Sequence, residues 1–223
     1  MLKGFIFDLD GVVIDTTAYH FQAWQKMAAS IGIQLNETIG ESLKSLDRID
    51  SLNKILAWAH QDDKYLPAQK QQLAAQKNQY YQEYIKNITP ADVMPGIYTL
   101  LVDIKAKGYK VALASASQNA AAILTKLRLT KYFDIEIDPT TLKQGKPDPE
   151  IFLKAAEALH VANHDIISLE DAPIGVQAIN AAGQFSVGIG NSHELTAADF
   201  NVTDTSQLTL DNLMLAYQKW DNK

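Results

Sequence analysis

The fold of this chain is decided by residues 4–11, which read Gly4-Phe5-Ile6-Phe7-Asp8-Leu9-Asp10-Gly11. The short apolar run 4–7 is typical of a buried strand, and it leads directly into two acids. Asp8 and Asp10 are two residues apart where a strand gives way to a loop, so both carboxylates can point the same way. Gly11 lets the chain turn closely around a bound group. An isolated pair of this kind is equally well a turn rich in Asp and Gly, so its meaning depends on the rest of the chain.

Further apolar runs alternate with segments of helical period. The predicted strands are 110–114, 134–137, 166–169 and 186–189, and the predicted helices are 96–107, 118–128, 149–160 and 173–183. Repeated alternation of strand and helix specifies a parallel sheet with helices on its faces. We therefore expect an α/β fold with a Rossmann-like parallel sheet as its core.

Residues 17–88 interrupt that pattern and are helical in period throughout. Apolar residues line two predicted helix faces, namely Phe21, Trp24, Ala28 and Ile31 on one and Leu52, Ile55, Leu56 and Ala59 on the other. Residues 68–87 are rich in Gln, Lys and Tyr and predict a largely solvated helix face. Pro90 and Pro95-Gly96 mark the return to the sheet. The expected organisation is a core of residues 1–16 and 89–223 with an inserted α-helical cap of residues 17–88.

Composition limits the partners of the chain. It has 223 residues, a formal net charge of −6 and no cysteine. The absence of cysteine excludes disulfides, thiolate chemistry and Cys-based zinc sites. An acidic chain without a long basic run is not expected to bind nucleic acid or an anionic membrane. We predict a cytoplasmic monomer that acts on small molecules.

Polar residues follow three further predicted strands, where the ligand site of a parallel sheet lies. They are Ser115 after 110–114, Lys146 in Gly145-Lys146-Pro147 after 134–137, and Glu170-Asp171 after 166–169. Each alone has an ordinary explanation: a helix N-cap, a solvated loop lysine, and a second N-cap. Together they bring Asp8, Asp10, Glu170 and Asp171 to one place. At ~4 Å each pair of carboxylates would repel by about 4 kcal/mol, so the cluster requires a cation, and oxygen ligands favour Mg²⁺.

The order and spacing of Asp8-x-Asp10-Gly11, Ser115, Lys146-Pro147 and Glu170-Asp171 resemble the haloacid dehalogenase superfamily. This resemblance implies phosphoryl transfer through an aspartyl phosphate on Asp8, with Asp10 as general acid and base. Ser115 and Lys146 would bind the phosphoryl oxygens. One Mg²⁺ would be held by Asp8, Asp10, Glu170 and Asp171, Asp10 contributing its backbone carbonyl.

The inserted cap resembles that of the β-phosphoglucomutases, a family within that superfamily. The resemblance lies in Asp15-Thr16, Tyr19-His20-Phe21 and Ala23-Trp24, in Leu43-Lys44 and Arg48, in Lys77-Asn78, and in residues 112–119 of the core. It implies interconversion of β-D-glucose 1-phosphate and glucose 6-phosphate through a sugar bisphosphate that also serves as activator. His20 and Thr16 would join the catalytic residues. The implied substrate-binding residues are Trp24, Lys44, Ser45, Leu46, Arg48, Lys77, Ser117, Gln118 and Asn119. Of these, Arg48, Lys77, Ser117 and Asn119 would bind the phosphate that is not transferred.

Some features leave other interpretations open. Ser45-Leu46-Asp47 stands where the family's loop has glycine and serine, and Gln118 stands where a lysine can occur, which puts the sugar specificity in question. A phosphatase of small sugar phosphates would use the same core chemistry without needing His20, Arg48 and Lys77. A catalytically silent module that binds metal and phosphate is a third hypothesis, which the intact acids disfavour. A zinc site at His160 and His164 is also disfavoured, because no Glu follows His160 and the pair flanks a predicted helix end.

Overall fold

A computed structural model describes residues 1–44 and 46–222. The chain divides into two compact units. A sheet unit comprises Met1–Asp15 and Thr89–Lys223, and a helical unit comprises Thr16–Ile88. The sequence predicted that the helical unit begins one residue later, at residue 17. Thr16 groups with the helices, and its Oγ1 accepts a hydrogen bond from the Tyr81 hydroxyl over 3.1 Å.

The sheet unit is built on a parallel sheet, as predicted. Its strands within the described residues are β1 (Gly4–Phe7), β2 (Lys110–Leu113), β3 (Ile135–Glu136), β4 (Ile166–Glu170), β5 (Phe185–Ile189) and β6 (Phe200–Val202). They lie in the order β3-β2-β1-β4-β5-β6, and every pairing is parallel. The α/β fold is thereby confirmed. Strand β3 is shorter than the predicted 134–137, and β6 was not predicted at all.

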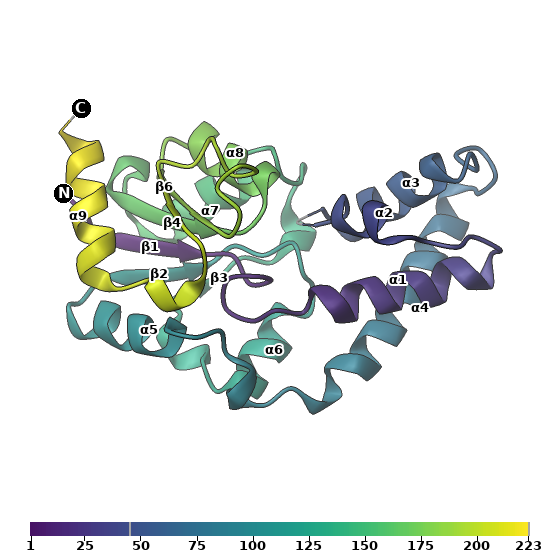
Figure 1. Cartoon of the computed structure of the whole chain (residues 1–223), viewed down its shortest axis with the longest axis horizontal. Helices are drawn as coiled ribbons and strands as arrows, with labels where there is room; N and C mark the ends of the chain where they lie inside the picture. Colours follow the sequence, from purple (N-terminus) through teal and green to yellow (C-terminus); the bar gives the residue numbers. More distant parts are fainter. Residues whose placement is uncertain (45, 223) are drawn as a thin grey trace. The chain divides into compact units, whose positions relative to one another are not determined.

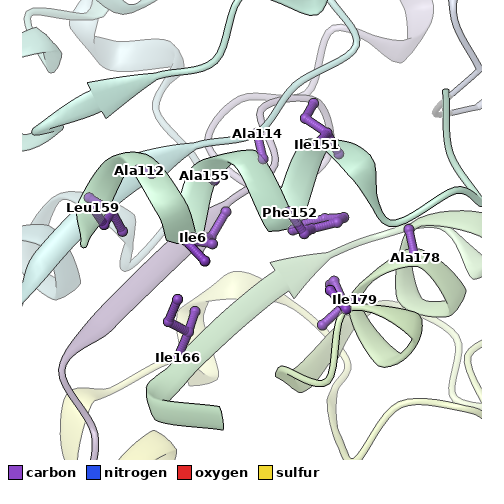
Figure 2. Close-up of a cluster of buried hydrophobic side chains, with 12 residues drawn as sticks. Ile6, Ala112, Ala114, Ile151, Phe152, Ala155, Leu159, Ile166, Ala178 and Ile179 are labelled. Carbon is purple, nitrogen blue, oxygen red and sulfur yellow. The ribbon is translucent and has the colours of Figure 1, made fainter. Parts of the chain in front are cut away.

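Helices cover the sheet on both sides (Figure 1). They are α5 (Ile97–Ala106), α6 (Ala120–Leu127), α7 (Glu150–Leu159), α8 (Pro173–Ala181) and α9 (Leu210–Asp221). On one face, α7 and α8 contribute Phe152 and Ile179 to a buried cluster with Ile6, Ala112 and Ile166 of the strands (Figure 2). Side chains of β1 alternate between the faces, so Phe5 and Phe7 pack against Tyr109 and Phe133 on the other side. Burial of β1 on both faces fixes the strand that carries Asp8.

Single-turn 3₁₀ helices connect several of these elements. They are η1 (Ile85–Asn87), η2 (Pro90–Asp92), η3 (Thr130–Tyr132), η4 (Pro139–Thr141), η5 (Asn163–Asp165) and η6 (Thr205–Gln207).

The helical unit contains α1 (Thr17–Ser30), α2 (Glu37–Glu41), α3 (Arg48–Trp58) and α4 (Pro67–Tyr84). Its core joins buried side chains of these helices, including Trp24, Met27, Ala28, Leu52, Ile55 and Leu56. Phe21 is only half-buried and lies over Gly40, where a Cβ would overlap its ring. Helix α4 is less solvated than predicted, because Ala74, Lys77 and Tyr81 are buried. Among the described residues, no helix combines the length and the apolar character that crossing a bilayer requires.

Candidate active site

The register of the sheet brings the predicted acids together. Phe7 of β1 pairs with Leu113 of β2 on one side and with Leu169 of β4 on the other. The next residues along the chain therefore lie side by side at the carboxyl edge. The N–H of Asp8 donates to the carbonyl of Leu169 over 3.0 Å, and the N–H of Ala114 donates to that of Phe7 over 2.8 Å. Asp8 and Glu170 thus extend from adjacent strands toward the same point.

Lys146 connects these strand ends from the loop that precedes α7. Its ammonium donates to Asp8 Oδ1 over 2.7 Å, to Glu170 Oε1 over 2.5 Å and to the Ala114 carbonyl over 3.2 Å. The three protons of an ammonium are thereby matched by three acceptors. The Lys146 and Glu170 side chains are 1% and 0% exposed, so water does not screen their ion pair. The alternative that Lys146 is an ordinary solvated loop lysine is wrong.

The charges in this cluster perturb one another. Burial is the largest influence on Asp8 and raises its pKa to about 7; the Lys146 ammonium opposes that rise, while Glu170 and Asp10 add to it. Burial disfavours the Lys146 ammonium, yet Asp8 and Glu170 outweigh burial and raise the pKa of Lys146 above its ordinary value. Lys146 therefore stays charged, while Asp8 loses its proton near neutral pH.

The acids suit a divalent cation. One carboxylate oxygen from each of Asp8, Glu170 and Asp171 lies within 4.8 Å of the other two. Both neighbouring glycines make room for this group, since a Cβ on Gly11 would overlap the Asp171 carboxylate and one on Gly175 would overlap that of Glu170. An all-oxygen donor set held this closely fits a hard cation. Within the described residues the group contains no carboxylate oxygen of Asp10, whose predicted contribution was a backbone carbonyl.

Both oxygens of the Glu170 carboxylate are already bound by the protein. Oε1 accepts from Lys146, and Oε2 accepts the N–H groups of Asp171 over 2.9 Å and Ala172 over 3.0 Å. These bonds fix the loop between β4 and α8. Glu170 therefore orients both Lys146 and the backbone that carries Asp171.

The segment after β2 has the predicted hydroxyl-rich turn. Ser115 is buried, and its Oγ accepts the N–H of Ser117 over 3.1 Å. Ser117 Oγ in turn accepts the N–H of Asn119 over 3.3 Å. Asn119 is buried directly before α6, whereas Gln118 is exposed. The two serine hydroxyls thus shape this turn, whatever they bind in addition.

In the helical unit, a buried lysine gathers the predicted residues of α1. Lys77 Nζ of α4 lies 2.8 Å from His20 Nδ1 and 4.9 Å from the ring centres of both Trp24 and Tyr81. The His20 and Tyr81 rings are 4.0 Å apart, and the Tyr81 hydroxyl binds Thr16. Thr16, His20 and Trp24 therefore do lie along one side of α1, as their spacing predicted.

The loop before α3 contains the other predicted residues of the helical unit. Arg48 is the first residue of α3, and its Nη2 donates to Asn78 Oδ1 on α4 over 3.0 Å. Lys44 forms an ion pair with Glu41 over 2.6 Å. Leu46 is half-buried, and Ser45, predicted to bind substrate, lies outside the described residues. These contacts orient Arg48 but leave its predicted role in substrate binding untested.

The two histidines considered for zinc have separate structural roles. His160 ends α7 in the left-handed conformation, with φ 56°. His164 stacks on Trp220, with ring centres 4.6 Å apart, and its Nδ1 lies 3.3 Å from Asp221 Oδ1.

Three contributors to these sites were not predicted from the sequence. Tyr81 lies in a helix with a largely polar sequence, although its position four residues after Lys77 puts it on the same helix face. Phe152, whose ring centre is 5.1 Å from Lys146 Nζ, and the Ala114 carbonyl have no motif of their own. Only the packing of α7 and the course of the lysine loop bring them to the site.

Comparison with known proteins agrees with this geometry. Residues 2–183 match the family model described as haloacid dehalogenase-like hydrolase. The β-phosphoglucomutase of Bacillus subtilis is 44% identical over 220 residues, a match that covers 99% of this chain and 96% of that protein. The phosphorylated carbohydrates phosphatase of Thermotoga maritima is 32% identical over 184 residues, which are 82% of each chain.

A solved structure is similar over the whole length. The crystal structure of β-phosphoglucomutase from Clostridium difficile superposes with a TM-score of 0.98 at 40% sequence identity, and the match covers 100% of both chains. Both the sheet unit and the helical insertion are therefore shared with that protein.

Proposed function

We infer the activity from the family to which this chain belongs, the haloacid dehalogenase-like hydrolases. The chain is a β-phosphoglucomutase, which interconverts β-D-glucose 1-phosphate and glucose 6-phosphate. The observation that carries this conclusion is the similarity to the Bacillus subtilis enzyme along the whole chain, helical unit included. The buried Asp8, Lys146 and Glu170 cluster supplies the chemistry that such an enzyme needs.

Asp8 is the nucleophile in this proposal. In the phosphorylated enzyme, the C6 hydroxyl of β-glucose 1-phosphate attacks the phosphorus on Asp8 and gives its proton to Asp10. The bond between Asp8 and phosphorus breaks, and the 1,6-bisphosphate forms. After the bisphosphate turns around, Asp8 attacks the C1 phosphate, and Asp10 returns the proton to the departing C1 oxygen. Glucose 6-phosphate leaves, and the phosphorylated enzyme is restored.

Lys146 supports both transfers from a fixed position. Its ammonium already contacts Asp8 Oδ1, and the Glu170 carboxylate holds it there. A charge fixed before the reaction stabilises the developing negative charge at little cost in reorganisation. We propose that Asp8, Asp171 and Glu170, with the Asp10 carbonyl, hold Mg²⁺, which when bound supplies further positive charge and favours the ionised form of Asp8. Ser115 is proposed to bind a phosphoryl oxygen.

The helical unit is where a mutase would differ from a phosphatase. A mutase must bind a second phosphate while its phosphorylated aspartate is kept from water. Support for this role comes from two oriented cations of the helical unit, Lys77 beside His20 and Arg48 beside Asn78. That they bind this phosphate together with Ser117 and Asn119 stays a prediction. So do the roles of Thr16, Trp24, Lys44, Ser45, Leu46 and Gln118, the monomeric state and the cytoplasmic location.

A phosphatase of small sugar phosphates is the second candidate, favoured by the similarity to the Thermotoga maritima enzyme. One assay separates the two functions. The protein is supplied with β-glucose 1-phosphate, Mg²⁺ and a trace of glucose 1,6-bisphosphate, and glucose 6-phosphate and free phosphate are followed in parallel. A mutase forms mainly glucose 6-phosphate, whereas a predominance of free phosphate would reject the mutase proposal.

Three controls make that assay specific. The α-anomer tests stereospecificity, and Asp8→Asn should abolish both products. Arg48→Ala should slow mutase turnover more than hydrolysis, because only the mutase must retain the second phosphate. Unchanged mutase turnover in Arg48→Ala would exclude Arg48 from phosphate binding.

A further inference from the structure

The start of α3 is fixed by Asp47, the residue directly before Arg48. Asp47 lies in the extended conformation, with φ −66° and ψ 169°, and Oδ1 accepts the N–H groups of Ile49 over 2.7 Å and Asp50 over 2.8 Å. Those N–H groups have no carbonyl partner within the helix, and a negative charge is favourable at this end. The Asp47 carboxylate is therefore a helix N-cap.

Arg48 follows directly and is restrained from two directions. Its backbone begins the turn that Asp47 closes, and its guanidinium donates to Asn78 Oδ1 on the neighbouring α4. Helix α3 is also connected to the preceding segment from its second turn, since Lys54 Nζ donates to the Ser42 carbonyl over 2.8 Å. Burial lowers the pKa of Arg48, and the charge of Asp47 opposes that effect. The same carboxylate thus acts on Arg48 through the backbone and through space.

We propose that Asp47 is a positioning residue that holds Arg48 ready for the non-transferring phosphate, while its negative charge weakens the binding of that phosphate. This inference rests on the proposed function, in which Arg48 binds the second phosphate of the sugar. The two effects of Asp47 have opposite signs, so they can be separated by substitutions that remove the charge with or without the cap.

Three variants separate them. Asp47→Asn keeps a good N-cap and removes the charge, Asp47→Ala removes both, and Asn36→Ala removes the cap of α2, where Asn36 Oδ1 accepts the N–H of Ile39 over 3.1 Å. The two alanine variants should each lower Tm by about 2–4 °C. The Asn36 variant therefore reports the effect of losing a helix cap in the same unit without touching Arg48.

The KM for glucose 1,6-bisphosphate is the informative quantity. We expect Asp47→Asn to lower this KM about threefold at low ionic strength. The difference from wild type should disappear near 0.5 M salt, because charges are then screened over roughly a few ångströms. We expect the KM of Asp47→Ala to exceed that of Asp47→Asn by about five- to tenfold, with kcat within about twofold. Asn36→Ala should leave KM unchanged. In an Arg48→Ala background the two Asp47 variants should share one KM.

Different results would overturn different parts of this inference. Equal KM values for Asp47→Asn and Asp47→Ala, or a raised KM in Asn36→Ala, would show that the cap does not position Arg48. A difference that persists without Arg48 would assign the effect to another residue. If the wild-type protein interconverts the sugar phosphates, these outcomes leave the proposed function intact. A wild-type protein without mutase turnover would overturn both.

Discussion

Replacing Lys146 with Met tests the charge balance of the active site. The methionine keeps most of the side-chain volume but removes the ammonium that lies between Asp8 and Glu170. Their carboxylates then face each other within 4.8 Å, where two full charges would repel by about 3.5 kcal/mol at an effective dielectric near 20, an upper limit because Asp8 can take up a proton. Removing one partner of a buried ion pair typically costs about 3–5 kcal/mol. We expect a loss of that size in the free energy of unfolding at pH 8 without divalent cations.

The loss should depend on pH and on cations, which an ordinary packing defect would not. The pKa of Asp8 is about 7 with Lys146 present and rises without it, so at pH 5 Asp8 carries a proton in both proteins and the loss should shrink by about 1 kcal/mol. Mg²⁺ at pH 8 should recover part of it, because a cation can replace the missing charge. Urea unfolding is followed by the fluorescence of Trp220 in α9, in a background where Trp24 and Trp58 are replaced by Phe. Trp220 then reports on the sheet unit alone.

Lys154→Met is the matched control. Lys154 also pairs with a glutamate, at 2.9 Å from Glu150, but its side chain is 35% exposed, so its removal should cost less than about 1 kcal/mol and should not respond to Mg²⁺. The reasoning fails if Lys146→Met costs no more than this control. It fails equally if the loss is the same at pH 5, at pH 8 and with Mg²⁺.

Three further predictions concern single positions. The pKa of Asp8 in the folded protein exceeds its ordinary 3.8, so cation-free wild-type protein should lose up to about 4 kcal/mol of stability as the pH rises from 4 to 7. In Asp8→Asn this dependence of stability on pH should flatten. Urea midpoints that change with pH as steeply in the variant as in wild type would contradict the prediction. Gly175→Ala forces a methyl group onto the Glu170 carboxylate, so it should lower the free energy of unfolding by about 1–3 kcal/mol. It should also weaken Mg²⁺ binding in calorimetric titration, and binding as tight as in wild type would contradict this. His160→Gly relieves the left-handed end of α7 and should raise Tm by about 2–4 °C in thermal unfolding, whereas a lower Tm would show that the imidazole makes a compensating contact.

The sheet unit was largely predictable because its strands are short, apolar and separated by helices of clear period. The exceptions are instructive. Strand β6 has three residues, Phe200-Asn201-Val202, too few to show a pattern, and it is recognisable only by its pairing with β5. Helix α9 was overlooked, although Leu210, Leu213 and Tyr217 recur at the spacing of a helix face and are buried.

The active site was predictable as a set of residues but not as a network. Parallel strands end at one edge, so the meeting of Asp8 with Glu170 follows from topology alone. The position of Lys146 does not, because it depends on the course of an irregular loop. In the helical unit, the burial of Lys77 contradicts the polar appearance of α4. It is accommodated by His20 and Trp24, which are distant in sequence, and by the ring of Tyr81 one turn further along the same helix.

The central place of β1 in the sheet has a consequence for the order of events during synthesis. Residues 4–7 leave the ribosome before both of their neighbours in the sheet, which are residues 110–113 and 166–169. At ~5–20 residues per second, the second neighbour emerges roughly ten to thirty seconds after the first strand. Through that interval the nascent chain carries its nucleophile without the second pair of acids, and for most of it without Lys146. Phosphoryl transfer can therefore begin only after synthesis has passed Asp171, the last acid of the site.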